Sequence, residues 1–503
     1  LQKLLKDGLL LFNYTGHGGT TALSDEKVLT QTDINQFTYT HLPVWVTATC
    51  DFTRFDDLNT SAGEDVFLNK SSGGIALFTT VRVAYSRPNF PINDNVIRNL
   101  FERNNGRRRT LGEVMQATKN TLSSVYKLGF CLIGDPAVKI AYPEFGMKVT
   151  TVNGQSVDGN SISFKALEKI TVEGEVLDAS GQLVTDFTGI VNPTVKDSKV
   201  TVTCLKNSNK DDSPAFTFTD YPNTIFIGND SVRNGKFSFT FTVPKDISYS
   251  NLQGKMNLYA VDTESGNEAQ GNFDNFIVGG TSDTAETDTI GPEIRALYLN
   301  DTTFVDGGQV NTTPYFVAEL WDKSGVNITG SSVGHDMMLV IDESTVLSYN
   351  LNSYYELLPG EDGTGIVKFP IPALEPGKHT AEFWVWDILN NSTVRTFTFE
   401  VVEGLKPFLF DVIATPGIAR EQVTFHLMHN RPESRMRVGI MVYDLAGRQL
   451  WKHEESGTSG LFENYTVSWD LTSGGARMRP GVYIYRAAIS TDNSKDATKA
   501  RKF

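Results

Sequence analysis

The chain has 503 residues, of which 40% are hydrophobic and 21% are charged, and its formal net charge is −14 at pH 7. A single hydrophobic core stops growing well below this length, so we expect several domains. The negative charge argues against a nucleic-acid-binding protein, which normally presents a basic patch. No stretch approaches the roughly 18 apolar residues of a membrane span. Any association with a membrane is therefore expected to depend on a partner or an anchor.

The start of the chain and its cysteines limit the interpretation further. Leu1 is not followed by the basic and apolar regions of a signal peptide. Because the predicted catalytic edge begins close to Leu1, we expect further sequence upstream. Three cysteines, Cys50, Cys131 and Cys204, are too few for a disulfide framework, and the odd number favours at least one free thiol.

Residues 1–143 alternate apolar runs with helical stretches, which is typical of a βαβ sheet. Gly134 and Pro136 are expected to turn the chain before a last short strand of this segment. The predicted strands cover residues 9–15, 43–49 and 74–80, and the predicted helices begin at Ser61 and occupy residues 91–103 and 109–126.

From residue 144 the pattern changes to short alternating runs separated by clusters of Asn, Asp, Gly and Ser. A period of two indicates half-buried strands. We predict an Ig-like β-sandwich at 144–279, a second sandwich at 290–403 and a third at 404–503. The polar segment Gly279–Thr289 is expected to link the first two. The predicted fold class is thus an α/β segment followed by three all-β sandwich domains.

Two reactive side chains follow neighbouring strands of the predicted sheet. His17 lies just past the run Leu9–Thr15, and Cys50 lies just past the run Pro43–Thr49. Open α/β sheets hold their chemistry beyond the carboxyl ends of their strands, so parallel neighbours would bring thiol and imidazole to one edge. An adjacent base converts a weakly ionised thiol into a nucleophile. We therefore predict Cys50 as nucleophile and His17 as its base, whereas His41 precedes a strand and belongs to the opposite edge.

Each of these residues also has an ordinary structural interpretation. A histidine in a glycine-rich turn commonly satisfies a loop hydrogen bond, and a lone cysteine is more often a small buried hydrophobe than a nucleophile. The matched placement of His17 and Cys50 favours chemistry at this edge. Cys131 and Cys204 lie within runs of strand residues and are predicted to be structural.

Backbone groups beside the two side chains are predicted to complete the site. The N–H groups of Gly18 and Cys50 would form an oxyanion hole, which stabilises the tetrahedral intermediate of acyl transfer. The alternative is that the glycine simply permits a positive φ, and both roles are compatible. No metal-ligand spacing, phosphate-binding loop or dinucleotide fingerprint occurs in the sequence, so we expect no cofactor and no metal.

Three further residues have two interpretations each. Glu64 is a possible acidic partner for the histidine, but the pattern Ser61-x-x-Glu64 favours helix capping. Arg82 and Tyr85 lie in the loop that leaves the third strand on the same edge as Cys50. That loop either lines a substrate cleft or serves as an ordinary connection.

Three motifs of the α/β segment resemble the gingipain family, bacterial cysteine peptidases in which an Ig-like domain follows the catalytic one. The motifs are Gly16-His17-Gly18, Ala48-Thr49-Cys50-Asp51 and Leu132-Ile133-Gly134-Asp135-Pro136. The resemblance implies a caspase-like fold for residues 1–143, with His17 as catalytic histidine, Cys50 as nucleophile, and Gly18 and Cys50 as backbone donors. It also implies that the acidic residue orienting the histidine lies upstream.

The last hundred residues resemble the C-terminal domain that directs cargo through the type IX secretion system of Bacteroidetes. The matching motifs are Tyr443-Asp444-Leu445-Ala446-Gly447, Trp469-Asp470 and Pro480-Gly481-Val482-Tyr483-Ile484-Tyr485. The order of the segments is similar to that of the sortase-like peptidase of that system, which retains this domain.

This second resemblance implies an enzyme on the extracellular face of the bacterial outer membrane. It would remove the C-terminal domains of cargo proteins and join the cargo to anionic lipopolysaccharide through a thioester acyl-enzyme on Cys50. The implied partners are the cargo proteins, other components of the attachment complex, and the outer-membrane β-barrel PorV, which would dock on residues 404–503. No nucleic-acid partner is expected.

Two other interpretations remain open. The chain could belong to a secreted gingipain-like endopeptidase whose C-terminal domain is removed on maturation, or to a noncatalytic surface adhesion protein with a peptidase-like head. The additional sandwich at 290–403 favours the sortase interpretation over the first. The presence of both His17 and Cys50 at strand ends favours an enzyme over the second.

Overall fold

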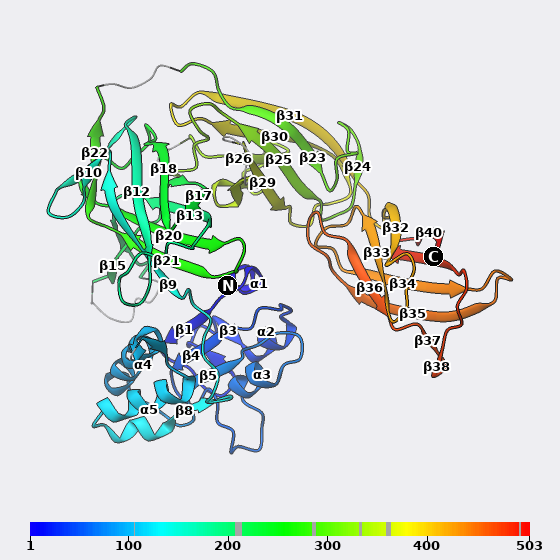
Figure 1. Ribbon diagram of the computed structural model, residues 1–503, viewed down its shortest axis with the longest axis horizontal. Helices are drawn as coiled ribbons and strands as arrows, with labels where there is room; N and C mark the ends of the chain where they lie inside the picture. Colours follow the sequence, from blue (N-terminus) through cyan, green and yellow to red (C-terminus); the bar gives the residue numbers. More distant parts are fainter. Residues whose placement is uncertain (105, 207–213, 284–287, 331–333, 359–363, 492–493) are drawn as a thin grey trace. The chain divides into compact units, whose positions relative to one another are not determined.

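The computed structural model describes residues 1–104, 106–206, 214–283, 288–330, 334–358, 364–491 and 494–503. The chain divides into two compact units. The first unit is Leu1–Gly146 with the short segments Leu177–Leu183 and Asn267–Ala269, and the second unit contains the remaining residues. The first unit is built on an α/β sheet and the second on β-sandwiches (Figure 1). The predicted fold class, an α/β segment followed by three all-β sandwiches, is confirmed.

A four-stranded sheet lies at the centre of the first unit. Its strands, in spatial order, are β1 (Leu11–Thr15), β4 (Val44–Ala48), β5 (Ala76–Thr80) and β8 (Phe130–Ile133). The first three run parallel, and β8 runs antiparallel to β5. The last strand of this sheet therefore precedes the turn at Gly134 and Pro136, whereas the sequence predicted it after that turn.

Helices cover both faces of this sheet (Figure 1). One face carries α4 (Ser86–Phe101) and α5 (Leu111–Thr121), the other carries α2 (Gln31–Gln36) and α3 (Ala62–Leu68), and α1 (Gln2–Asp7) precedes β1. Val46 and Phe78 pack towards α4 and α5, while Trp45 and Leu77 pack towards α2 and α3. Because both faces are covered, β4 and β5 read as continuous apolar runs.

The helix boundaries differ from those predicted. The helix predicted at 91–103 begins at Ser86, so Pro91, a residue typical of a first helical turn, lies inside it. The helix predicted at 109–126 ends at Thr121, and a 3₁₀ turn, η1 (Val125–Gly129), follows. Two hairpins complete the unit: β2 (Ala22–Leu23) with β3 (Leu29–Thr30), and β6 (Arg103–Asn104) with β7 (Arg107–Arg108). Among the described helices, none has the length and apolar character needed to cross a bilayer.

The first sandwich has a nine-stranded sheet, a three-stranded sheet and a separate hairpin. The large sheet contains β9 (Phe145–Val152), β10 (Gln155–Ser156), β12 (Lys169–Leu177), β13 (Gly189–Lys196), β16 (Thr224–Ile227), β17 (Asp230–Arg233), β18 (Lys236–Thr242), β20 (Lys255–Asp262) and β21 (Glu268–Phe273). The small sheet contains β11 (Ile162–Ala166), β19 (Leu252–Gln253) and β22 (Phe276–Thr281), and the hairpin pairs β14 (Val200–Thr203) with β15 (Thr217–Asp220).

The segment predicted as a linker, Gly279–Thr289, is only partly an irregular connection. Strand β22 continues through Thr281, because its residues still pair with β11. Residues 284–287 lie outside the described part of the chain. Asp288 is placed against the second sandwich, where its carboxylate accepts a hydrogen bond from Ser324 at 2.8 Å.

In the described residues the second sandwich contains two sheets, and the third contains two sheets and a separate two-stranded hairpin. The second is formed by β23 (Glu293–Leu299), β25 (Tyr315–Trp321), β28 (Tyr355–Leu357) and β29 (Thr364–Pro370), with β24 (Gln309–Val310), β26 (Met338–Ile341), β27 (Ser348–Asn350), β30 (Gly377–Trp386), β31 (Ser392–Val401) and the turn η2 (Asn352–Tyr354). The third is formed by β32 (Leu409–Thr415), β33 (Val423–His429) and β36 (Tyr465–Trp469), with β34 (Met436–Tyr443), β35 (Gln449–Gly457), β39 (Ile484–Ser490), β40 (Ala497–Lys502) and the hairpin β37 (Thr472–Ser473)–β38 (Ala476–Arg477). Alternate residues of these strands form separate cores around Phe316 and Phe425.

Candidate active site

Strands β1 and β4 bring His17 and Cys50 to the same edge of the sheet. The two strands are parallel neighbours, and their last residues, Thr15 and Ala48, form a register pair. His17 and Cys50 each follow that pair at the same spacing. The N–H of Gly16 donates to the Ala48 carbonyl at 3.4 Å, so the pairing continues past the strands. His41 precedes β4 and lies at its opposite end.

Gly18 lies directly against the residue that precedes the thiol. A Cβ atom on Gly18 would lie 2.4 Å from Oγ1 of Thr49, closer than any real side chain allows. Glycine is therefore required for this turn to approach Cys50. The neighbouring Gly19 has no atom within 4 Å of its Cβ position, so it is free of this constraint.

The backbone of His17 is fixed, whereas its ring is exposed. The Tyr14 hydroxyl donates to the His17 carbonyl at 2.6 Å, and the N–H of Ser24 donates to the same oxygen at 2.7 Å. Burial raises the pKa of Tyr14, which keeps this hydroxyl a donor. The imidazole makes no hydrogen bond with any residue that the structure describes, so it is available to the thiol or to a substrate.

The thiol of Cys50 is held by the loop that follows β5. Its Sγ donates to the carbonyl of Ala84 at 3.1 Å, and the N–H of Ala84 donates to the sulfur at 3.4 Å. The next residue, Asp51, adopts a positive φ of 50° and donates its N–H to the Arg82 carbonyl at 3.3 Å. The loop therefore packs against the sulfur.

Two backbone donors at this edge have no acceptor among the described residues. Within the described ranges, the N–H groups of Gly18 and Cys50 make no hydrogen bond. The bridge between Gly18 and Leu23 is made by the groups that flank Gly18, which leaves the Gly18 N–H unused. Free backbone N–H groups next to a nucleophile are the donors that an oxyanion requires.

Glu64 caps α3 in the structure. Its Oε2 atom accepts hydrogen bonds from the Ser61 N–H at 2.8 Å and from the Ser61 hydroxyl at 2.6 Å. This arrangement satisfies an N–H group that would otherwise be unpaired at the start of the helix.

The two loop residues considered for a substrate cleft have neighbours of their own. Arg82 binds both carboxylate oxygens of Asp56, at 3.0 and 2.6 Å, and this pairing lowers the pKa of Asp56. Tyr85 is 62% exposed, and its ring packs edge-on against Tyr126 with 5.3 Å between centroids. Tyr85 is thus the more accessible of the two to a ligand.

The remaining cysteines lie outside this edge. Cys131 is a partly exposed residue of β8 that pairs with Thr79. Cys204 was predicted to be structural, but it is exposed and lies just past the end of β14. Both are free thiols, as is Cys50.

The comparison with known proteins now decides the family. Residues 1–141 match the profile of Peptidase family C25. Residues 1–141 belong to this family. Cys50 and His17 therefore lie in the segment that defines a family of cysteine peptidases, here called the C25 segment.

Similarity to solved structures extends beyond the C25 segment. The chain is 37% identical to PorU of Porphyromonas gingivalis in the crystal structure of its dimeric latent form, with 80% of this chain and 38% of that chain covered and a TM-score of 0.36. It is 19% identical to the Arg-specific cysteine proteinase gingipain R, RgpB, with 55% of this chain and 54% of that chain covered and a TM-score of 0.26. The RgpB pro- and mature-domain complex from P. gingivalis matches at the same identity over 55% of this chain and 56% of that chain, with a TM-score of 0.26. None of the curated proteins compared with the chain matches it.

The C25 segment also contains buried polar groups that the sequence analysis missed. Oγ1 of Thr49, Oγ1 of Thr80 and Oδ1 of Asn89 are buried without a partner among the described residues. Asn89 also donates from Nδ2 to the Thr49 carbonyl at 3.4 Å. The signal in the sequence was the concentration of threonines at the ends of otherwise apolar strands.

One group of carboxylates in the second sandwich has the geometry of a metal site. Asp288, Asp322 and Asp387 bring one oxygen each within 4.8 Å of the others. Asp322 is 6% exposed and Asp387 is fully buried. Burial, together with the two neighbouring carboxylates, raises the pKa of Asp322 to about 6.

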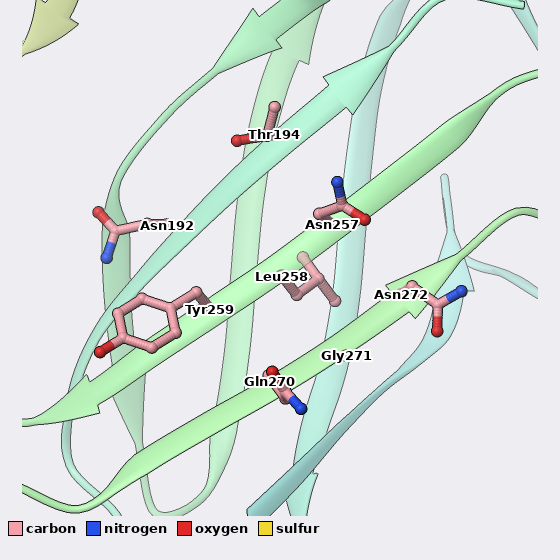
Figure 2. Close-up of a pocket in the computed structure, with 8 residues that line it drawn as sticks. All are labelled: Asn192, Thr194, Asn257, Leu258, Tyr259, Gln270, Gly271 and Asn272. Atoms are coloured by element: carbon pink, nitrogen blue, oxygen red, sulfur yellow. The ribbon is translucent and has the colours of Figure 1, made fainter. Parts of the chain in front are cut away.

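A hollow of about 530 Å³ lies on the large sheet of the first sandwich (Figure 2). It is lined by amide and hydroxyl side chains of β13, β20 and β21, with Leu258 and Gly271 between them. These side chains are Asn192, Thr194, Asn257, Tyr259, Gln270 and Asn272. The lining contains no thiol, imidazole or carboxylate.

Proposed function

We propose that the chain is the nucleophile-bearing part of a cell-surface cysteine endopeptidase and transpeptidase of the gingipain family. The single observation that carries the proposal is the placement of Cys50 and His17 beyond one register pair of two parallel strands. Membership of residues 1–141 in Peptidase family C25 supports it.

The chemistry follows from these groups. Sγ of Cys50 attacks the carbonyl carbon of the scissile peptide bond, and the thiol proton passes to the His17 ring. The negative charge that develops on the carbonyl oxygen is stabilised by the N–H groups of Gly18 and Cys50. His17 then returns the proton to the leaving amine, and a thioester on Cys50 remains. An acceptor amine or water resolves the thioester, and the better-placed nucleophile reacts first.

The hydrogen bonds between Cys50 and Ala84 make one step obligatory before attack. Both the proton and a lone pair of the sulfur are used by the Ala84 backbone. Substrate binding must therefore displace the loop that contains Ala84, Arg82 and Tyr85. In this proposal the displaced loop lines the substrate cleft.

The proposed substrates are type IX secretion cargo proteins that end in a C-terminal signal domain. The enzyme removes that domain and transfers the cargo to an amine of anionic lipopolysaccharide. The third sandwich, residues 404–503, docks on the outer-membrane β-barrel PorV, and other components of the attachment complex assemble there. The 37% identity to PorU over 80% of this chain supports the assignment.

The test replaces Cys50 by Ala in cells that carry the whole protein. Cargo is expected to keep its C-terminal domain and to remain unanchored while the variant is still exposed on the surface. The matched control is Cys131→Ala, because Cys131 is also a free, partly exposed thiol of the first unit. Normal processing of cargo by the Cys50→Ala variant would refute the proposal and favour a noncatalytic adhesion protein.

A secreted endopeptidase is distinguished by its own C-terminus. Retention of the chain to Phe503 on the native protein is expected for the sortase, whereas removal of residues 404–503 on maturation is expected for a secreted gingipain-like enzyme. Mass spectrometry of the purified native protein identifies its C-terminal residue and so distinguishes the two.

A further inference from the structure

We infer that Asn89 is a positioning residue for the oxyanion hole, acting through the peptide unit between Thr49 and Cys50. The inference rests on the proposed cysteine-peptidase chemistry and deepens it. It assigns a role to a side chain 39 positions along the chain from Cys50 that neither the sequence motifs nor the family match singles out.

The geometry joins Asn89 to one of the two oxyanion donors. Nδ2 of Asn89 donates to the carbonyl oxygen of Thr49 at 3.4 Å. The Thr49 carbonyl and the Cys50 N–H belong to the same peptide unit, which is planar and rigid. A side chain that fixes the direction of the carbonyl therefore fixes the direction of the N–H on the opposite side.

The hydrogen bond from Asn89 also makes the Cys50 N–H a stronger donor. A hydrogen bond to a peptide carbonyl draws electron density towards the oxygen and makes the N–H of that peptide a stronger donor. This polarisation is larger where water is excluded, and Asn89 is only 4% exposed. The Cys50 N–H has no acceptor among the described residues, so the gain is available to a substrate oxyanion.

The other half of the Asn89 amide argues against a purely structural role. Its Oδ1 atom is buried and has no hydrogen-bond partner within the described ranges. An unpaired buried acceptor is unfavourable, and a leucine of similar size would fill the space without it. Asparagine at position 89 instead uses its Nδ2 group, which donates to the Thr49 carbonyl.

The backbone of Asn89 is also bonded to the loop that binds the Cys50 sulfur. Its N–H donates to the Tyr85 carbonyl at 3.2 Å at the start of α4. Tyr85 follows Ala84, whose backbone binds the Cys50 sulfur. The first turn of α4 thus connects the thiol loop with the peptide that precedes the thiol.

The test separates oxyanion stabilisation from thiol reactivity in the purified full protein. Asn89→Leu removes the donor at similar volume, and Asn89→Ala is a second variant in case leucine prevents folding. The matched control is Asn93→Leu, because Asn93 lies in the same helix and has an unpaired Oδ1, but makes no hydrogen bond to Thr49. Folding of each variant is verified by its thermal unfolding curve.

Three readouts are compared for each variant. The first is kcat and KM on a peptide that spans the junction before a cargo C-terminal domain. The second is the affinity for the aldehyde of that peptide. The Cys50 sulfur adds to the aldehyde carbon, and the thiol proton passes to the former carbonyl oxygen. That oxygen then occupies the oxyanion hole. The third is the alkylation rate with iodoacetamide, in which the Cys50 sulfur displaces iodide from the CH₂ carbon and no oxyanion forms.

For both Asn89 variants we expect kcat and aldehyde affinity to fall about tenfold to a hundredfold, somewhat less than the loss on removing an oxyanion donor outright. KM and the alkylation rate are expected to stay within about twofold, since neither reports on the oxyanion. The Asn93→Leu protein is expected to match the wild type in all three measurements.

Three other outcomes would overturn the inference. Wild-type values of kcat and aldehyde affinity in folded Asn89 variants would show that the residue does not act on the hole. A parallel fall in the alkylation rate would show that it acts on the thiol or on the fold. If the wild-type protein alkylates at Cys50 but neither cleaves the peptide nor binds the aldehyde, the proposed function itself fails, and the inference fails with it.

Discussion

His17 and Cys50 are related by the register of their strands: each follows, at the same spacing, one member of the pair Thr15 and Ala48. In a parallel pair, a slip of one residue would send one of these side chains to the other face of the sheet. The register is in turn fixed by burial on both faces, because Val46 packs towards α4 and α5 while Trp45 packs towards α2 and α3. The core of the first unit therefore sets the geometry of the site.

Replacing Gly18 by Ala should disable the site through a steric effect. The added Cβ would lie 2.4 Å from Thr49 Oγ1, so the turn that bears His17 must move away from Cys50. We expect peptidase activity to fall at least about tenfold, since small displacements of reacting groups are costly. Gly19→Ala is the control, because nothing lies within 4 Å of its Cβ position.

A second-site variant checks that the effect of Gly18→Ala is steric. Thr49→Ala removes the two side-chain atoms nearest to the added Cβ, Oγ1 at 2.4 Å and Cγ2 at 3.3 Å. The double variant should regain part of the activity lost by Gly18→Ala alone. Activity no higher in the double variant than in Gly18→Ala would contradict the steric explanation.

The ion pair between Arg82 and Asp56 should restrain the loop that holds the thiol. Arg82 binds both oxygens of Asp56, and its carbonyl accepts the N–H of Asp51. Asp56→Asn removes the charge and is expected to raise the iodoacetamide alkylation rate of Cys50 about twofold to threefold, because exposed ion pairs are weak. High salt should have a similar effect on the wild type and little on the variant. An unchanged alkylation rate in Asp56→Asn would mean that the ion pair does not restrain the loop.

The second sandwich should become more stable as the pH falls below neutrality. Burial raises the pKa of Asp322 from an ordinary value of 3.8 to about 6, so the folded state binds a proton that the unfolded state does not. The stabilisation is complete below pH 3.8 and is lost as the pH rises through about 6. Its upper bound is about 3 kcal/mol. Asp322→Asn should reduce this dependence, and the part that remains is expected from Asp387, whose pKa is also raised by burial.

Hydrogen exchange of the amides in β25 and β30 measures the local free energy of opening of this sandwich. The protein is held in EDTA, so that divalent cations do not neutralise the three carboxylates. A dependence on pH that is identical in the wild type and in Asp322→Asn would show that other groups cause it.

The third sandwich should respond to acid in the opposite direction. Burial lowers the pKa of His429 from 6.5 to about 4, with the nearby Arg431 acting in the same sense. Between these pKa values the unfolded state binds a proton that the folded state does not bind. The contribution of His429 to stability is therefore complete above pH 6.5 and is lost as the pH falls through about 4. The upper bound is again about 3 kcal/mol.

His429→Gln keeps a hydrogen-bonding side chain but cannot be protonated, so it should flatten this dependence. The Nε2 atom of His429 lies 2.8 Å from the Ser459 hydroxyl, and the amide can replace that bond. Exchange of the β33 and β34 amides between pH 7 and 4 is the measurement. A steep loss of protection in His429→Gln equal to that of the wild type would contradict the assignment.

Parts of this architecture were accessible from the sequence because they depend on local pattern. Strands buried on both faces appear as largely apolar runs, which predicted β4 and β5 and placed His17 and Cys50 after strand ends. The capping pattern Ser61-x-x-Glu64 predicted the start of α3, because the contact spans a single turn. Alternation predicted the sandwiches, since one face of each strand meets a core.

Other parts were not accessible because they arise only in the folded chain. The approach of Ala84 to the Cys50 sulfur and of Asn89 to the Thr49 carbonyl joins segments that are distant in sequence, and neither has a periodic signal. The start of α4 was missed because Pro91 lies inside the helix, where propensity argues against it. Tertiary packing overrides propensity at this position.

The hydrogen bonds between Cys50 and Ala84 also affect how readily oxidants reach the Cys50 sulfur. A thiolate reacts with peroxide and passes to sulfenic and then to irreversibly oxidised acids. At Cys50 the proton is donated to the Ala84 carbonyl and the sulfur accepts the Ala84 N–H, so the loop after β5 covers part of the sulfur surface. An oxidant must therefore approach the sulfur on the side that the Ala84 backbone leaves uncovered, and any movement of this loop would widen that approach.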